Sequence, residues 1–212
     1  MFTDRVDAGR RLAEALMDRL PADALILGVP RGGVIVAAEV ARVLGHDLDI
    51  EVVRKIGAPG NPEYAIAAVD ADGELIAGEG LAADAEYLHR EAQSAGAEIH
   101  RRLESYRGDR PGSAIAGHTV VLVDDGIATG LTLVAAVRSL RRRGAAHIIA
   151  AAPVASPSAE QALHRVADEV VVLWVDPHLQ AVGQYYARFD QTSDAEVVDV
   201  LRAAWQEREQ AR

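Results

Sequence analysis

Residues 120–132 read Val-Val-Leu-Val-Asp-Asp-Gly-Ile-Ala-Thr-Gly-Leu-Thr. The apolar, β-branched start of this stretch is typical of a strand that is buried on both faces of a parallel sheet. Two adjacent carboxylates follow it, then a short turn of glycines and hydroxyl groups, and then a predicted helix. Ligands of such sheets bind at the carboxyl ends of the strands. The stretch therefore predicts an α/β fold with a binding site at residues 124–132.

The rest of the chain continues this alternation of strands and helices. Apolar runs predict strands, and apolar residues at helical spacing predict helices. Strands are expected at residues 24–28, 49–53, 64–69, 74–77, 119–123, 147–153 and 169–175, and helices at residues 4–20, 34–44, 81–106, 131–143, 158–166 and 194–206. Residues 54–62 are rich in glycine and proline, so we expect a mobile loop there. The pattern predicts a mostly parallel, Rossmann-like sheet with helices on both faces.

The composition excludes several classes of protein. The 212 residues include no cysteine, which rules out disulfides and thiolate catalysis. The net charge of −10 argues against a nucleic-acid partner, because the phosphate backbone would be repelled. No apolar run approaches the roughly 20 residues that span a bilayer, so no membrane association is expected. Together with a charged N-terminus that is unlike a signal peptide, this predicts a cytoplasmic protein.

The predicted helix at residues 81–106 is the longest, and it carries one apolar stripe. The stripe repeats at intervals of three and four residues, as expected of one helix face. The simplest interpretation is a helix packed on the sheet or on a neighbouring helix. The same stripe could instead hold two copies together as a homodimer.

The chemistry of residues 124–132 points to a phosphorylated sugar. Backbone N–H groups at a helix N-terminus, with threonine hydroxyls beside them, form a site for a phosphate. Two carboxylates next to that phosphate would repel it. They fit better against the vicinal hydroxyls of a sugar, or against a Mg²⁺ ion shared by the sugar and a diphosphate.

This stretch resembles the signature of type I phosphoribosyltransferases, in which apolar residues, two acids and a loop ending in Thr-Gly-x-Thr follow one another. The resemblance implies that the chain binds 5-phosphoribosyl-1-pyrophosphate (PRPP) with Mg²⁺. It implies that Asp124 and Asp125 bind the ribose hydroxyls. The 5-phosphate site would consist of Gly126, Ile127, Ala128, Thr129, Gly130 and Thr132.

Two residues depart from the family pattern. Gly126 stands where an aliphatic residue or serine is usual, which a loop tolerates. Ala128 stands where enzymes that act on 6-oxopurines usually carry an aspartate that contacts the purine. Because alanine cannot exchange a proton, a hypoxanthine- or guanine-type reaction is disfavoured and the acceptor stays open.

Two further segments resemble the diphosphate-binding parts of the family. Pro30, Arg31, Gly32 and Gly33 follow the first predicted strand, and their glycines let backbone amides approach an anion closely. The family often has a non-proline cis peptide here, so Pro30–Arg31 or Val29–Pro30 is the expected place. Arg54 and Lys55 open the predicted loop, which would close over PRPP. The resemblance gives catalytic roles to Asp124, Asp125, Arg31 and Lys55.

The C-terminal segment is where the family places a hood over the acceptor. Trp174 could stack on a base, and Asp176 or His178 could read or deprotonate it. The tryptophan could equally fill core. Residues 182–189 are unusually aromatic and are expected to cover the edge of the sheet. We expect one domain over residues 1–212, with a core at about 24–175, one long inserted helix, and a hood formed mainly by 174–212 with the N-terminal helix.

The sequence therefore predicts a phosphoribosyltransferase that joins phosphoribosyl to a nitrogenous acceptor and releases pyrophosphate. The whole chain also resembles a group of bacterial phosphoribosyltransferase-like proteins with the same Pro-Arg-Gly-Gly loop and a Gln-Tyr-rich C-terminal segment, which supplies no substrate. Two alternatives stay open: a non-catalytic regulator that binds PRPP or a nucleotide, and a Mg²⁺-dependent phosphosugar or nucleotide hydrolase.

Overall fold

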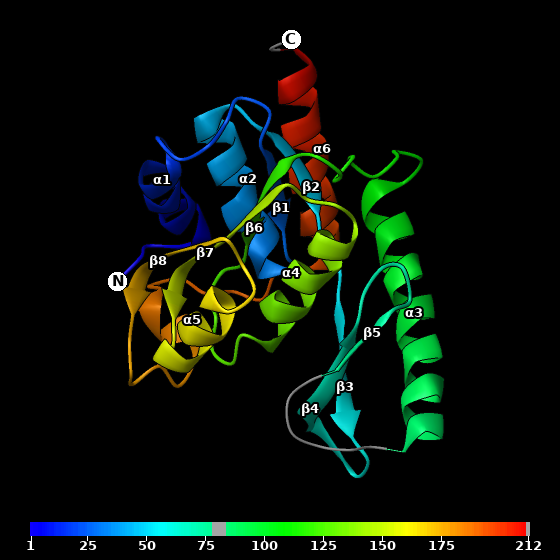
Figure 1. Ribbon diagram of the computed structural model, residues 1–212. Coiled ribbons are helices and arrows are strands. Elements are labelled where there is room, and N and C mark those ends of the chain that lie inside the picture. Colours follow the sequence, from blue (N-terminus) through cyan, green and yellow to red (C-terminus); the bar gives the residue numbers. More distant parts are fainter. Residues whose placement is uncertain (78–83, 211–212) are drawn as a thin grey trace.

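The main sheet has five parallel strands in the order β2-β1-β6-β7-β8, as Figure 1 shows. The computed structural model describes residues 1–77 and 84–210. The strands are β1 (Leu25–Gly28), β2 (Asp47–Ile50), β6 (Thr119–Val123), β7 (His147–Ala155) and β8 (Glu169–Val175). The predicted parallel sheet is confirmed, with β6 and β8 at the expected residues.

Helices cover both faces of this sheet. Alternate residues of each strand enter two separate clusters, because successive side chains of a strand point to opposite faces. Ile26 and Val121 pack in one cluster, and Leu27 and Leu122 in the other. The first cluster includes residues of α1 (Arg5–Leu16), α2 (Gly32–Leu44) and α6 (Asp194–Gln210), and the second includes residues of α4 (Leu131–Arg142) and α5 (Pro157–His164). The sheet is therefore doubly wound, as predicted.

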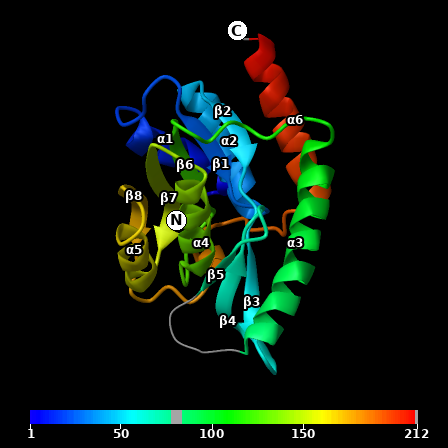
Figure 2. The ribbon, with the colours of Figure 1, turned by 45° about the vertical axis from the view of Figure 1, so that its right-hand side comes forward.

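A second, antiparallel sheet stands beside the first and packs against the longest helix (Figure 2). It consists of β3 (Arg54–Ala58), β4 (Asn61–Val69) and β5 (Leu75–Ala77), and the helix is α3 (Ala85–Arg107). The prediction of a loop at residues 54–62 is wrong. β3 pairs with β4, and Ile56 is buried between them and the core. The glycine and proline signal belongs to a tight turn in which Gly60 has a φ of +75°.

The apolar stripe of α3 packs against other parts of the same chain. Ile99 and Tyr106 are buried in the same cluster as Ile56 of β3 and Trp205 of α6. The sequence left two interpretations open, packing within the chain and a homodimer contact. For the described part of the stripe, packing on a sheet and a neighbouring helix is confirmed. Its first predicted residue, Leu81, lies outside the described residues.

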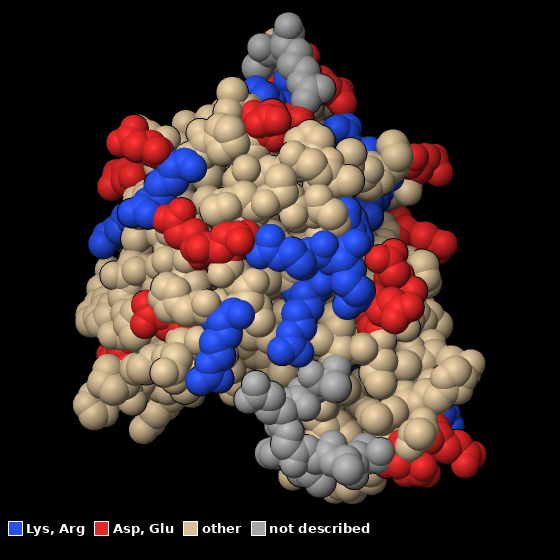
Figure 3. All heavy atoms as spheres, in the orientation of Figure 1, with Lys and Arg blue, Asp and Glu red and all other residues tan. Residues whose placement is uncertain are grey.

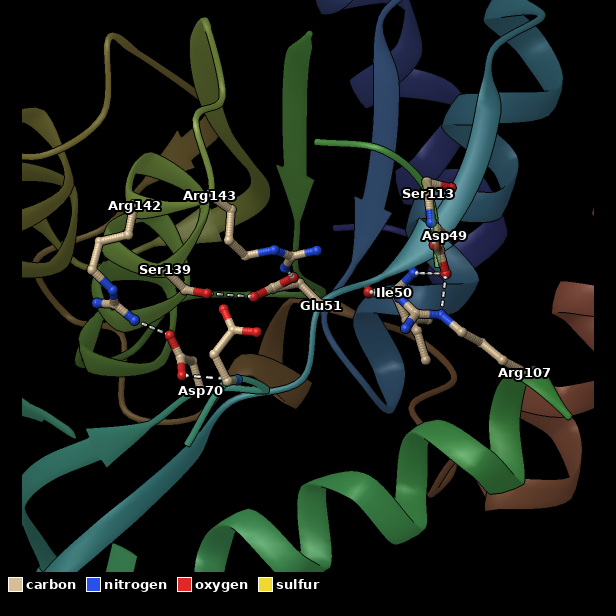
Figure 4. Close-up of polar contacts among 10 residues, drawn as sticks. Asp49, Ile50, Glu51, Asp70, Arg107, Ser113, Ser139, Arg142 and Arg143 are labelled. Carbon is tan, nitrogen blue, oxygen red and sulfur yellow. Dashed lines mark hydrogen bonds and ion pairs between the residues drawn. The ribbon is translucent and has the colours of Figure 1, made fainter. Parts of the chain in front are cut away.

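Buried carboxylates join the main sheet to this second unit (Figure 4). Glu51, in the link from β2 to β3, accepts hydrogen bonds from Ser139 Oγ at 3.0 Å and Arg143 Nη1 at 2.8 Å. Asp70, after β4, is paired with Arg142. A third carboxylate, Asp49, is paired with Arg107 at the end of α3 and accepts the backbone N–H of Ser113. Each pair connects two different elements, so together they fix the second unit against α4 and β2.

Basic side chains gather over α4 on the face that Figure 3 shows. The arginines at the end of this helix are each engaged with a carboxylate. Arg141 pairs with Asp168, Arg142 with Asp70, and Arg143 with Glu51. Their charges are therefore largely offset within the chain.

The N-terminal residues lie against the segment that follows β8 (Figure 1). Backbone hydrogen bonds join Phe2 to Tyr185 and Ala187, at the end of the short 3₁₀ helix η1 (Val182–Tyr185). Ser193 caps α6, because its Oγ accepts the N–H of Glu196 at 3.1 Å. α1 ends at Leu16 and not at residue 20. None of the described helices has the length and hydropathy needed to cross a membrane.

Candidate functional site

An open cleft of about 230 Å³ lies at the carboxyl end of β6. Its floor is the turn between β6 and α4. The described residues that line it are Lys55, Asp124, Gly126, Ile127, Ala128, Thr129, Gly130, Thr132, Leu133 and Val182. The structure thus brings the predicted turn, one of the two acids and one predicted cation into a single hollow.

The N-terminus of α4 opens into this cleft. Gly130 begins the helix with a left-handed φ of +77°, and a Cβ there would lie 3.2 Å from Ala159 Cα. Glycine is therefore needed both for the turn and for close packing on α5. The first N–H groups of a helix have no partner within it, and the helix dipole favours an anion there. With Thr129 and Thr132 beside it, the turn can bind a phosphate.

The two acids after β6 differ in their surroundings. Asp124 lines the cleft and accepts the N–H of Asp125 at 2.8 Å. Burial, together with the neighbouring Asp125 carboxylate, raises the pKa of Asp124 well above its usual range, and the charge of Lys55 opposes the shift. A cation or hydroxyl donors in the cleft would stabilise the ionised form of Asp124. Both belong to the ligand predicted for this site.

Asp125 lies next to Asp124 and against Arg5 of α1. It is not among the described residues that line the cleft, and its Oδ2 is 2.7 Å from Arg5 Nε. Both side chains are largely buried, with 12% of Arg5 and 16% of Asp125 exposed. Asp125 therefore differs from Asp124 in being paired with an arginine of the protein.

The Pro30–Gly33 segment packs directly on the acids. A Cβ on Gly33 would lie 2.8 Å from the Asp124 Cα, and a Cβ on Gly32 would overlap the Asp125 carboxylate. The two glycines thus leave room for the neighbouring acids, whether or not an anion binds. The peptide bond Pro30–Arg31 is cis, at one of the two places where it was expected.

The predicted cations lie on different sides. Arg54 and Lys55 are both exposed on β3, and successive residues of a strand point in opposite directions. Lys55 lines the cleft. Arg54 and Arg31 are not among the described residues that line it, so only Lys55 lies against the turn in this conformation.

The predicted acceptor residues lie together at the end of β8, outside this cleft. Trp174 is 46% exposed and meets the Tyr185 ring edge-on at 5.4 Å, so it does not fill core. Asp176 accepts hydrogen bonds from Tyr185 Oη at 2.6 Å and from the backbone N–H of His178 at 2.7 Å. The Tyr185 hydrogen bond holds the pKa of Asp176 below its usual range, which makes this carboxylate a weak base.

Sequence reasoning missed three residues that touch the turn. Arg5 pairs with Asp125, and Tyr186 donates its hydroxyl to the Asp125 backbone carbonyl at 2.5 Å. Burial raises the pKa of Tyr186, so it stays a donor. Val182 lines the cleft. Residues 182–189 were noted as aromatic, but nothing in the sequence indicated that they reach the acids rather than the sheet edge.

Val182 also explains why residue 126 is a glycine. A Cβ on Gly126 would lie 2.7 Å from Val182 Cγ2 and 3.0 Å from Val154 Cγ1. We expect Gly126→Ala to lower the free energy of unfolding by about 1–3 kcal/mol, the usual cost of overpacking. Combining it with Val182→Ala should recover most of that loss, because the larger clash is removed. Urea unfolding of the two single variants and the double variant checks this, and a strictly additive double variant would contradict it.

Comparisons with known proteins agree with this fold. The model of the phosphoribosyl transferase domain matches residues 3–181. A Mycobacterium tuberculosis H37Rv protein named "Putative phosphoribosyl transferase Rv0571c" is 41% identical over 208 residues, which cover 96% of this chain and 47% of that protein. The chain thus spans about half the length of this relative.

Solved structures show the same relationship. The crystal structure of TT1426 from Thermus thermophilus has 47% sequence identity to this chain. The match covers 94% of this chain and 97% of TT1426, with a TM-score of 0.84. The AQ2163 protein of Aquifex aeolicus shares the fold alone, with 14% identity over 94% of this chain and 85% of that chain and a TM-score of 0.51. By the domain match and the identity to these relatives, the chain belongs to the phosphoribosyl transferase domain family.

Proposed function

We propose that the chain binds Mg²⁺–PRPP in this cleft and transfers its phosphoribosyl group to a nitrogenous acceptor, with release of pyrophosphate. One observation carries the proposal. The N-terminus of α4, Asp124 and Lys55 line one cleft. A phosphate and the hydroxyls of the sugar that bears it can then be bound together.

The parts of PRPP map onto separate parts of the site. The 5-phosphate would lie on residues 126–132, where helix N–H groups and threonine hydroxyls converge. The ribose hydroxyls would face Asp124 and Asp125. The diphosphate would lie between the Pro30–Gly33 segment and Lys55, with Arg31 and Arg54 as the further cations proposed for it.

The residues present fit a Mg²⁺ ion that arrives with the substrate. The described residues contain no group of three or more His, Asp or Glu side chains that could hold a metal. Mg²⁺ commonly uses one or two carboxylates and completes its shell with waters and substrate phosphates. Asp124 and Asp125 would supply the carboxylates, and the bound ion would offset charge on the diphosphate.

In the proposed reaction the acceptor nitrogen bonds to C1 of the ribose, and the bond from C1 to the diphosphate oxygen breaks. The electron pair of that bond leaves with pyrophosphate. The proton lost by the acceptor nitrogen goes to water or to a group on the substrates, because Asp176 is a weak base. Catalysis would come from positioning and from cationic stabilisation of the leaving group.

Residues beyond this cleft would select the acceptor. Ala128, exposed at its rim, offers no side chain that can exchange a proton with a purine. Trp174 has an exposed face beside Asp176 and could stack on a planar acceptor. We therefore propose a planar nitrogenous acceptor that needs no proton donor at residue 128.

Calorimetric titration with PRPP in the presence of Mg²⁺ tests the proposal. The wild type should saturate, and Asp124→Asn/Asp125→Asn should lose binding by about 100-fold or more, since two charge-assisted hydrogen-bonding groups are removed. Asp72→Asn, a substitution in an exposed turn, is the matched control and should bind like the wild type. Pyrophosphate release would then be measured across candidate acceptors.

The outcomes separate the alternatives. No saturation in the wild type would refute PRPP binding. Tight binding without turnover on any acceptor would favour the regulatory protein over the transferase. Loss of PRPP without an acceptor would favour the hydrolase.

A further inference from the structure

Arg5 lies against the acid pair and is held there by three partners. Its Nε is 2.7 Å from Asp125 Oδ2, and its Nη1 donates to the backbone carbonyl of Asp190 at 2.8 Å. Its guanidinium stands 3.9 Å from the centre of the Phe189 ring, a cation–π contact. With 12% of the side chain exposed, Arg5 is fixed in one place and is not a solvated surface charge.

The segments that carry these contacts are tied to each other. Phe2 N–H donates to the Tyr185 carbonyl at 2.7 Å, and Ala187 N–H donates to the Phe2 carbonyl at 2.8 Å. Tyr186, between them, donates its hydroxyl to the backbone carbonyl of Asp125. The N-terminal and C-terminal segments therefore hold Asp125 from two sides, by its side chain and by its backbone.

This arrangement has an electrostatic consequence for the ligand. Two carboxylates beside a phosphate and a diphosphate repel both, and the Arg5 cation offsets one of them. A carboxylate has about four lone-pair positions, and the Arg5 contact uses Oδ2. The remaining positions can still accept hydrogen bonds from sugar hydroxyls.

We propose that Arg5 is a positioning residue of the ribose site, which orients the Asp125 carboxylate and neutralises its repulsion of the PRPP phosphates. The inference rests on the proposed function and refines it. It makes the two acids unequal, with Asp124 facing the ligand directly and Asp125 acting through an orientation that Arg5 sets.

A purely structural role for Arg5 predicts something different. Arg5 could serve only to connect α1 to the C-terminal segment through Phe189 and Asp190. Its removal would then lower stability, and any effect on binding would not depend on Asp125. A double-mutant cycle between Arg5 and Asp125 separates the two roles.

The experiment measures Mg²⁺–PRPP affinity for a matched pair, Arg5→Met and Arg5→Lys, with unfolding temperatures for both. Methionine keeps a long apolar stem without charge. Because the contact to Asp125 is made by Nε, a lysine ammonium can reach the same oxygen. We expect Arg5→Met to bind about 30-fold more weakly and Arg5→Lys to recover most of that affinity. Arg188→Ala removes an exposed ion pair to Asp4 on the same segment and should bind like the wild type.

The double-mutant cycle between Arg5 and Asp125 decides between the two roles. In the Asp125→Asn background, Arg5→Met should change affinity by less than about twofold, because its target is gone. Equal losses in Arg5→Met and Arg5→Lys, or an undiminished loss in the Asp125→Asn background, would overturn the positioning role while leaving PRPP binding intact. Failure of the wild type itself to bind would instead refute the proposed function on which the role depends.

Discussion

Gly32→Ala is expected to weaken Mg²⁺–PRPP binding by about 100-fold while the protein stays folded. The new methyl group would overlap Asp125 Oδ2 and lie 2.7 Å from both Asp125 Cγ and Arg5 Nε. These atoms belong to side-chain ends, so they can move without disturbing the backbone. The displaced carboxylate would lose about two hydrogen bonds to the sugar, each worth roughly 1.5 kcal/mol when one partner is charged. Calorimetric titration and a thermal melt measure the two effects.

Gly96→Ala is the control for this substitution. Gly96 lies within α3, and a Cβ there would have no other atom within 4 Å. Alanine is favoured over glycine in a helix by roughly 1 kcal/mol, so this variant should be slightly more stable and should bind PRPP unchanged. If Gly32→Ala bound PRPP as tightly as the wild type, the Asp125 carboxylate would not belong to the ribose site.

The main sheet was predictable because its strands carry their own signal. β6 and β8 begin and end where the sequence predicted, since short apolar runs bounded by polar residues are typical of strands. The helix that follows β6 begins at Leu131, as expected after Gly130. In these places local preference and the global fold agree, so one sequence was enough.

The second sheet was predictable only in part: strands were expected near β4 and β5, but not at β3. Residues 54–58 form a strand only because they pair with β4 across a tight turn, and Ile56 gains a place in the core. Glycines and prolines in the segment indicate a turn but do not show how short it is. Pairing between segments overrides local preference here, which is a general limit of propensity for strands.

The candidate site also has a part that the sequence predicts and a part that it does not. Residues 124–132 are contiguous, so their cleft could be predicted from strand, turn and helix signals alone. The Arg5–Asp125 pair joins residues 120 positions apart, and no pattern near Arg5 marks it. The orientation of Asp125 therefore depends on tertiary packing that the sequence does not display.

Glu51→Gln is expected to remove a pH dependence of stability between about pH 4.5 and 7. Burial raises the pKa of Glu51 from 4.5 to about 7, although Arg143 and Ser139 oppose the shift. The folded state thus holds a proton more tightly than the unfolded state does. Protonated Glu51 favours the fold fully below pH 4.5, and this advantage is lost as the pH rises to about 7. The shift corresponds to about 3 kcal/mol.

The measurement compares the free energy of unfolding in urea for wild type and Glu51→Gln from pH 4.5 to 8. Their difference cancels the other titrating groups, so it should change by about 3 kcal/mol in favour of the variant as the pH rises. Arg143, left without its carboxylate, is 26% exposed and can be hydrated.

Glu39→Gln is the control of opposite sign. Hydrogen bonds from Arg42 and Arg10 lower the pKa of Glu39, so removing this carboxylate should destabilise the fold at neutral pH. Parallel curves for wild type and Glu51→Gln would mean that the ion pair with Arg143 fully compensates the burial of Glu51. The link between the two sheets would then hold a permanently charged pair instead of a carboxyl group that titrates near neutrality.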